Sequence, residues 1–276
     1  KSEQDHEHPR RGRKRRGAQG DRGRPGSSRW LSSLGVCLCP RRQPGKGSRD
    51  YGIEKICPDA YNNIWAGGAG FLLLKKNNEP DFKVLNKELG LTDAFTVSFL
   101  KPISATHIAA GISGHGMLLF NMQTGKYEGK IPEEITDIAV YNDTVHAITK
   151  AEIVTARLNG VQWQLIQSAS HPVFKQCVPS GIVRDQEMRL WIGSNQGIIM
   201  YDPSTGKFSF MRADTQNERA LKDNNVNNLF IDNQNNLWIS TSKLLHVAHL
   251  SEPFLTAYSR SSSGPACALH GFMKVA

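Results

Sequence analysis

The sequence has few of the residues that build metal centres or disulfide frameworks. Only five cysteines occur among 276 residues, and no two of them form a CxxC pair. None of the nine histidines belongs to a cluster at metal-ligand spacing. Structural zinc sites need four such ligands at short, regular spacings, so this pattern argues against one. We therefore expect no metal and no cofactor.

Long apolar runs and catalytic motifs are also missing. The apolar stretch Trp30–Cys39 follows a basic segment and resembles a signal peptide in outline. It is too short to span a bilayer, and no small-x-small cleavage site follows it. No Gly-x-Ser-x-Gly motif occurs, and no helix pattern follows Gly67–Gly70 to make it a phosphate-binding loop. The sequence therefore predicts a protein without a membrane span, without a clear signal peptide and without enzymatic activity.

The net charge of +9 is confined to one end of the chain. Residues 1–50 hold 14 Lys/Arg and 5 Asp/Glu, whereas residues 51–276 hold 20 of each. The first 50 residues have few apolar side chains to bury, so we expect a disordered basic tail. Nucleic acid or an anionic surface would bind only through this tail. Residues 259–276 continue no pattern of the chain, and we expect a flexible C-terminal tail.

Residues 51–258 contain short apolar runs separated by turns rich in Gly, Asn and Asp, which is typical of an all-β domain. In three segments an Asp stands six positions before a Trp. These pairs are Asp59 and Trp65, Asp185 and Trp191, and Asp232 and Trp238. A second repeated element, ending in Thr-Gly-Lys-aromatic, occupies Gly116–Tyr127 and Gly197–Phe208. Counting back from it identifies two weaker units, with Ala109 and His146 at the Trp position.

The five Trp-equivalent positions are 37 to 47 residues apart. A period of this length holds four short strands, which is the size of a β-propeller blade. We predict five blade-like units, at residues 51–95, 96–133, 134–175, 176–222 and 223–258. They form either a small ring or a truncated arc of a larger one. Each Trp is expected to pack between neighbouring blades, and each Asp to accept hydrogen bonds from turn amides.

Through these two elements, the chain resembles the two-component regulator propeller repeat. Residues Asp185–Phe208 follow the repeat almost throughout, and Lys222–Thr241 follow its first half. Ser242–Leu245 lack the glycine of the family turn, which puts the start of the next strand in doubt. The resemblance implies the periplasmic, extracytoplasmic sensor part of a bacterial hybrid two-component protein, which responds to oligosaccharides and forms homodimers. The kinase of such proteins is absent from this sequence.

The connections that lead into the inner strands surround the mouth of a propeller channel, so their polar residues are candidates for ligand binding. One holds Asn224, Asn225, Asn227 and Asn228, and the corresponding one holds Thr92 and Asp93. Amide side chains suit sugar hydroxyls because they donate and accept without charge, although turn propensity is the simpler explanation of these asparagines. The sequence thus predicts a ligand-sensing propeller that binds an oligosaccharide or another small molecule. The alternative is a non-catalytic interaction scaffold whose basic tail binds nucleic acid or anionic surfaces.

Overall fold

The computed structural model describes residues 52–92, 94–214, 216–217, 220–250 and, for the backbone alone, 255–258. Both predicted tails and Asp93 lie outside these residues. The described part consists of twenty strands and a 3-10 helix, η1 (Pro172–Lys175). None of its helices is long and apolar enough to cross a membrane.

The strands form five antiparallel sheets of four consecutive strands each. We call these sheets blades 1 to 5. Blade 1 holds β1 (Ile53–Pro58), β2 (Ile64–Gly68), β3 (Phe71–Lys75) and β4 (Lys83–Val84). Blade 2 holds β5 (Val97–Pro102), β6 (His107–Ile112), β7 (Gly116–Asn121) and β8 (Tyr127–Ile131). Blade 3 holds β9 (Asp137–Tyr141), β10 (Thr144–Ile148), β11 (Glu152–Asn159) and β12 (Gln162–Ser170). Blade 4 holds β13 (Pro179–Arg184), β14 (Leu190–Ser194), β15 (Gly197–Asp202) and β16 (Lys207–Met211). Blade 5 holds β17 (Val226–Ile231), β18 (Asn236–Thr241), β19 (Leu245–His249) and β20 (Leu255–Tyr258).

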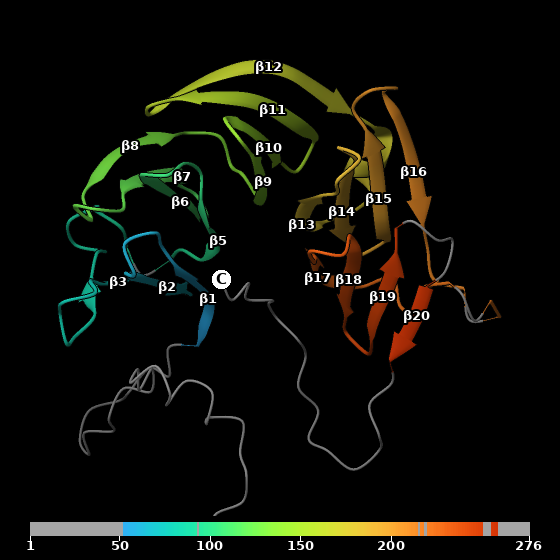
Figure 1. The fold of residues 1–276 in the computed structure, drawn as a ribbon, viewed down its shortest axis with the longest axis horizontal. Coiled ribbons are helices and arrows are strands. Elements are labelled where there is room, and N and C mark those ends of the chain that lie inside the picture. Colours follow the sequence, from blue (N-terminus) through green and yellow to red (C-terminus); the bar gives the residue numbers. More distant parts are fainter. Residues whose placement is uncertain (1–51, 93, 215, 218–219, 251–254, 259–276) are drawn as a thin grey trace, which may run out of the picture. The chain divides into compact units, whose positions relative to one another are not determined.

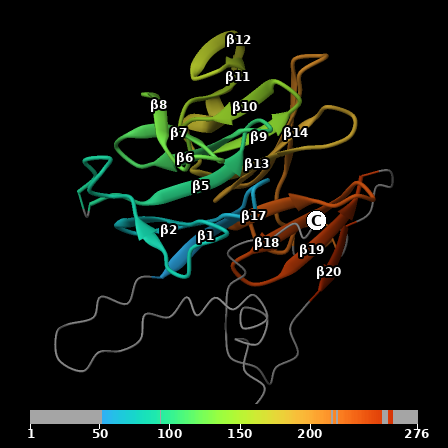
Figure 2. The ribbon, with the colours of Figure 1, turned by 60° about the vertical axis from the view of Figure 1, so that its left-hand side comes forward.

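The five blades are arranged in a ring, so the predicted β-propeller is confirmed. The first strand of each blade lies nearest the centre, and the later strands lie progressively farther out (Figure 1). Inner strands contact one another in chain order: β1 with β5, β5 with β9, β9 with β13, and β13 with β17. The turned view shows the blades as successive twisted sheets (Figure 2). The inner strands therefore place their side chains around a common axis.

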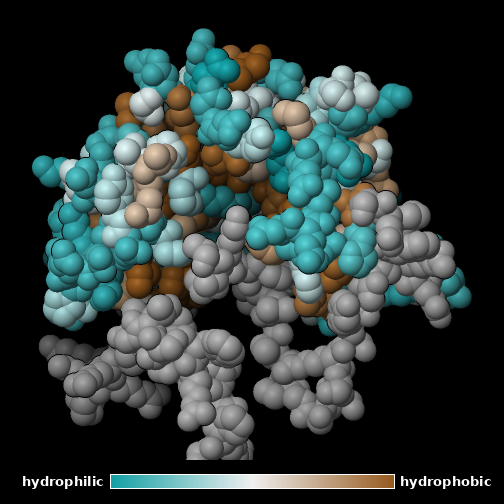
Figure 3. Space-filling model, viewed as in Figure 1, coloured by the Kyte–Doolittle hydropathy of each residue, from teal (hydrophilic) through white to brown (hydrophobic). Residues whose placement is uncertain are grey.

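Apolar residues gather between the blades. Of the buried clusters in the described residues, one joins blades 1 and 2, one joins blades 2 and 3, one joins blades 3 and 4, and one joins blades 4 and 5. Apolar residues are seen between the blades and toward the centre, whereas the rim is mainly hydrophilic (Figure 3). A single blade cannot bury both faces alone, so stacking against its neighbours supplies the core.

The Asp of each repeat fixes the hairpin between the first two strands of its blade. In blade 1, the Asp59 carboxylate accepts hydrogen bonds from the backbone N–H groups of Tyr61 and Asn63. Its second oxygen accepts the indole N–H of Trp65 at 2.8 Å. The same indole bond, also at 2.8 Å, joins Trp191 to Asp185 and Trp238 to Asp232. One carboxylate therefore holds the turn and orients the indole.

Glycine is absent from the third-strand turn of blade 5, yet β19 forms normally. The Thr241 hydroxyl accepts the backbone N–H of Leu244 at 3.0 Å and donates to the carbonyl of the same residue at 2.9 Å. The Thr241 N–H also donates to that carbonyl. A threonine side chain thus closes this turn by hydrogen bonds to the neighbouring backbone.

His146, at the Trp position of blade 3, is buried and lies 3.0 Å from the Thr155 hydroxyl. Burial lowers the pKa of its imidazole from 6.5 to about 4, and nearby Arg184 acts in the same direction. The unfolded chain therefore binds this proton more readily than the folded one, so acid favours unfolding.

Stability is expected to fall as the pH drops from 6.5 to about 4, with His146 contributing to the slope. Replacing His146 by Gln removes the titrating group, so the free energy of unfolding should depend less steeply on pH in that interval. Urea denaturation at a series of pH values measures both slopes. Identical slopes for the variant and the wild type would contradict this assignment.

Candidate binding channel

Lys101 and Asp137 meet at the axis of the ring and connect three blades. The Lys101 ammonium of β5 lies 2.8 Å from one carboxylate oxygen of Asp137, on β9, and 2.7 Å from the other. It also donates to the carbonyl of Ile138 at 2.7 Å. Asp137 further accepts the backbone N–H of Ile182, on β13, at 3.0 Å. The two opposite charges are thus paired with each other inside the protein. This pairing fixes the positions of the two side chains.

A hollow of about 340 Å³ lies between the inner strands, and we call it the channel hollow. Its polar lining residues are Glu54, Lys55, Ser98, Lys101, Asp137, Ser180 and Asn228. The Ser180 hydroxyl oxygen is buried and has no hydrogen-bond partner within the described part of the chain. A buried hydroxyl without a partner destabilises the folded state, because it has lost its hydrogen bonds to water and has formed none with the protein. An unmet hydrogen bond therefore lies in the wall of the hollow.

A second hollow, of about 600 Å³, lies where the inner strands end, and we call it the Arg184 hollow. The two hollows share Lys101, Val183 and Phe230, so they adjoin. The carbon of the Arg184 guanidinium lies 3.5 Å from the centre of the Tyr141 ring, which makes a close cation–π contact. Burial lowers the pKa of this guanidinium, while Tyr141 and Asp185 act in the opposite sense. A guanidinium remains charged despite such shifts, so this hollow carries a permanent cation.

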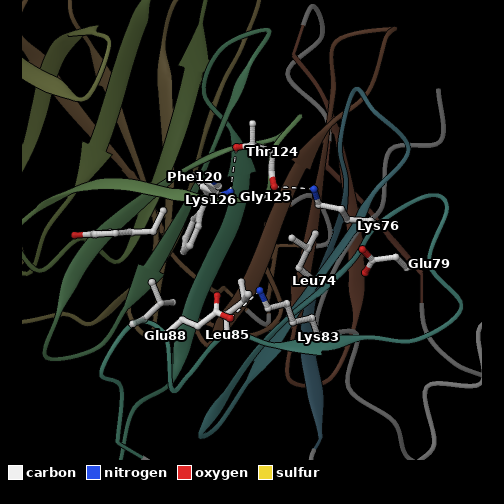
Figure 4. Close-up of a pocket in the computed structure, with 12 residues that line it drawn as sticks. Leu74, Lys76, Glu79, Lys83, Leu85, Glu88, Phe120, Thr124, Gly125 and Lys126 are labelled. Atoms are coloured by element: carbon white, nitrogen blue, oxygen red, sulfur yellow. Dashed lines mark hydrogen bonds and ion pairs between the residues drawn. The ribbon is translucent and has the colours of Figure 1, made fainter.

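A third pocket, of about 490 Å³, lies away from the axis between blades 1 and 2. Leu74, Leu85 and Phe120 form its apolar part (Figure 4). Two of its lysines are already engaged: Lys83 pairs with Glu88 at 2.7 Å, and the Lys76 ammonium donates to the Thr124 carbonyl at 2.7 Å.

Of the asparagines predicted from the sequence, Asn224 and Asn225 lie on the connection into β17, whereas Asn227 and Asn228 lie within β17 itself. The first two serve the fold directly. The Asn224 side-chain oxygen accepts the N–H of Ala213 at 2.7 Å, and its backbone carbonyl accepts the N–H of Gly197. The Asn225 amide donates to the Ser242 hydroxyl at 2.6 Å. Asn227 is half-buried and Thr92 is exposed, and neither lines the hollows described above. The neighbouring Asn228 does line the channel hollow.

Sequence reasoning missed Lys101, Asp137, Tyr141, Ser180 and Arg184. One local signal for Lys101 existed, because a lysine interrupts the otherwise apolar end of an inner strand. Asp137 gives a similar signal, since it opens the apolar run of β9. Neither signal says that the two side chains meet, because their strands belong to different blades.

Comparison with known proteins supports the resemblance drawn from the repeats. Residues 220–243 match the family described as two component regulator propeller, which confirms the resemblance for blade 5. No curated protein matches the chain.

Solved structures share the fold at low sequence identity. The extracellular domain of the putative hybrid two component system BT4673 from B. thetaiotaomicron is 18% identical, with a TM-score of 0.60. The match covers 78% of this chain and 28% of that one. A structure titled "YCF48 bound to D1 peptide" is 12% identical, with a TM-score of 0.53, and the match covers 78% of this chain and 69% of that one. The chain thus spans just over a quarter of the length of the two-component extracellular domain that it resembles.

Proposed function

We propose that this propeller is a ligand-sensing module that binds a small polar solute, an oligosaccharide, in the channel hollow. The buried Ser180 hydroxyl, which has no partner within the described residues, is the observation that carries the proposal. The family match in blade 5 and the fold shared with an extracellular two-component domain support a sensory role. The same likeness supports a location outside the cytoplasm. Homodimeric assembly is a further part of the proposal.

The lining of the channel hollow suits sugar hydroxyl groups, which both donate and accept hydrogen bonds. Ser98 and Ser180 offer hydroxyls, Asn228 offers an amide, and Glu54 offers a carboxylate. The half-buried Ile56, Val183 and Phe230 add apolar surface against which the C–H faces of a sugar ring can lie. About half of the lining residues are polar, so the hollow is more polar than the usual small-molecule pocket and suits a ligand rich in hydroxyl groups. The proposal includes binding without a chemical step, and the family match indicates no enzyme class.

The connection into β17 remains part of the proposed site. Asn225 is the last residue of this connection, and Asn227 lies at the start of β17 beside Asn228, so a ligand longer than one sugar ring would extend from the hollow toward them. Thr92 and Asp93 occupy the corresponding connection into blade 2 and complete this predicted mouth. Asn224 contributes by holding the connection in place through its bond to Ala213.

Replacing Ser180 by Ala separates a binding role from a folding role. Because the hydroxyl has no partner within the described part, its removal should leave the free protein as stable or slightly more stable. Binding of an oligosaccharide should weaken about tenfold when one hydrogen bond to the ligand is lost. Isothermal titration of the full chain with a panel of neutral oligosaccharides, together with thermal melting, measures both quantities.

Asn225→Ala is the matched variant at the mouth, and it should weaken binding less than Ser180→Ala. A panel in which no saccharide binds the folded wild type would contradict the proposal. So would a saccharide whose affinity depends on Asn225 and not on Ser180, because the site would then lie outside the channel hollow.

A scaffold role is the second candidate, and the concentration of positive charge in residues 1–50 favours it. In that case binding to nucleic acid should disappear when residues 1–50 are deleted and should fall steeply with added salt. Association that survives high salt would contradict the scaffold role.

A further inference from the structure

Arg184 differs from Lys101 and Arg189, two other cations of the inner blades, because its charge has no ion-pair partner within the described residues. Lys101 is paired with Asp137. Arg189 is paired with Asp185 at 2.6 Å and with Glu187 at 2.8 Å. Asp137 is thus paired with Lys101, whereas Asp185 shares Arg189 with Glu187. Glu54 lines the channel hollow and not the Arg184 hollow. The charged side chains that line the Arg184 hollow are Lys101, Arg184 and Asp185, so its lining carries one positive charge in excess.

The guanidinium also has an unused donor. Its Nε–H is buried and has no hydrogen-bond partner in the described part of the chain. Asp185 does not satisfy it, because the Asp185 carboxylate is fully buried and accepts from the Arg189 side chain and from the Trp191 indole. An unpaired donor on a charged group costs more than one on a neutral group, which favours a ligand that completes it.

Tyr141 holds this guanidinium flat. The cation lies 3.5 Å above a ring that is itself 50% exposed, so the pair forms a planar surface at the wall of the hollow. A planar guanidinium matches a carboxylate with two parallel N–H···O bonds, a geometry that an ammonium cannot supply. Phe230, Ile231 and Ile138 line the same hollow and offer apolar surface beside the charge.

The remaining groups that face Arg184 do not oppose an anion. His146 is neutral above about pH 4, since burial and Arg184 both lower its pKa. Gln186 lines the hollow as an uncharged side chain. Lys101 lies in the wall shared with the channel hollow and adds no negative charge.

We propose that Arg184 and Tyr141 form a subsite for the carboxylate of an acidic saccharide, such as a uronic acid unit. This inference rests on the proposed saccharide binding and specifies its ligand class. The acidic unit lies in the Arg184 hollow with its carboxylate on the guanidinium, and the adjoining sugar units extend into the channel hollow.

The test compares an oligogalacturonide with the neutral galactan oligomer of equal length. Isothermal titration of the full chain should give an affinity for the acidic oligomer about tenfold or more above that for the neutral one. Arg184→Gln should abolish this preference by weakening the binding of the acidic oligomer far more than that of the neutral one. Arg184→Lys, which keeps the charge and loses the planar fork, should retain only part of it. Arg157→Gln is the matched control, because Arg157 pairs with Asp143 on blade 3 and lines none of the hollows.

Three results would overturn the inference. The first is equal affinity for the acidic and neutral oligomers, which would leave saccharide binding intact and remove the carboxylate subsite. The second is an acidic preference that survives Arg184→Gln, or Tyr141→Leu if the Gln variant does not fold. The third is competition by inorganic phosphate as effective as that by galacturonate, which would make the site a general anion site. If neither oligomer binds, both the subsite and the proposed function fail.

Discussion

Replacing Trp65 by Ala is expected to destabilise the protein by about 3–5 kcal/mol, because a fully buried indole leaves a large cavity. Trp65 belongs to the core between blades 1 and 2, and its ring lies 5.2 Å from that of Phe120. Its indole N–H is also bonded to Asp59. Truncation removes the packing between two blades and leaves the Asp59 oxygen without its indole donor.

Trp238→Ala is the matched comparison, and we expect it to cost about 1–2 kcal/mol, since less apolar surface is lost from a half-buried ring. Leu237 and Ile239 belong to the core shared with blade 4, so Trp238, between them in β18, points to the opposite face. Urea denaturation of both variants measures the difference. Equal costs would mean that the far face of blade 5 is as tightly packed as the interior between blades.

At every Trp-equivalent position the side chain points away from the preceding blade. The Trp65 and Trp238 variants therefore compare equivalent positions of the repeat. Trp65 faces blade 2, Ala109 faces blade 3 and Trp191 faces blade 5. His146 lies between Val145 and Ala147, which face blade 2, so it points toward blade 4. The repeat therefore uses one position to contact the next blade, whichever residue occupies it.

Asp185→Ala is expected to cost about 2–4 kcal/mol, because it leaves several buried donors without an acceptor. The backbone N–H of Arg189 donates to one carboxylate oxygen at 2.8 Å, and the Arg189 side chain and Trp191 indole donate to the other. The Asp185 side chain is fully buried, so water cannot replace these bonds. Asp185→Asn should cost less, because it keeps one acceptor oxygen in place.

Asp202→Ala is the control for Asp185, since Asp202 also closes a turn but does so in solvent. It accepts hydrogen bonds from Ser204 and Thr205, which water can satisfy in its absence, so we expect a clearly smaller cost than for Asp185→Ala. Urea denaturation of the full-length variants gives both values. If Asp185→Ala costs no more than Asp202→Ala, the buried network does not hold the hairpin.

The blade architecture could be predicted because its signals are local. Apolar runs that end in Asp, an Asn or Met at positive φ three residues later, and a Trp three residues after that define a hairpin from one short segment. Because this segment recurs along the chain, a signal that is weak in one copy is sufficient to predict the fold. The hydrogen bond from the indole to the Asp carboxylate was not anticipated, because it depends on the twist of the hairpin rather than on the spacing alone.

The interior of the ring could not be predicted in the same way. Lys101 and Asp137 are brought together by the register and packing of two different blades, and Ile182 of a third blade completes the contact. Tyr141 and Arg184 meet for the same reason. The asparagine-rich connection was identified from its residue types, yet the hydrogen bonds of Asn224 and Asn225 to neighbouring loops depend on tertiary structure.

Hydrogen–deuterium exchange of the full chain, with and without a saturating oligosaccharide, tests the central claim most directly. Binding within the channel should slow exchange in the inner strands, above all in β5, β9 and β13, which carry Lys101, Asp137 and Ser180. The outer strands β8, β12 and β16 should exchange at unchanged rates. Protection confined to residues outside the inner strands, or no protection at any saccharide concentration, would contradict the assignment of the channel as the binding site.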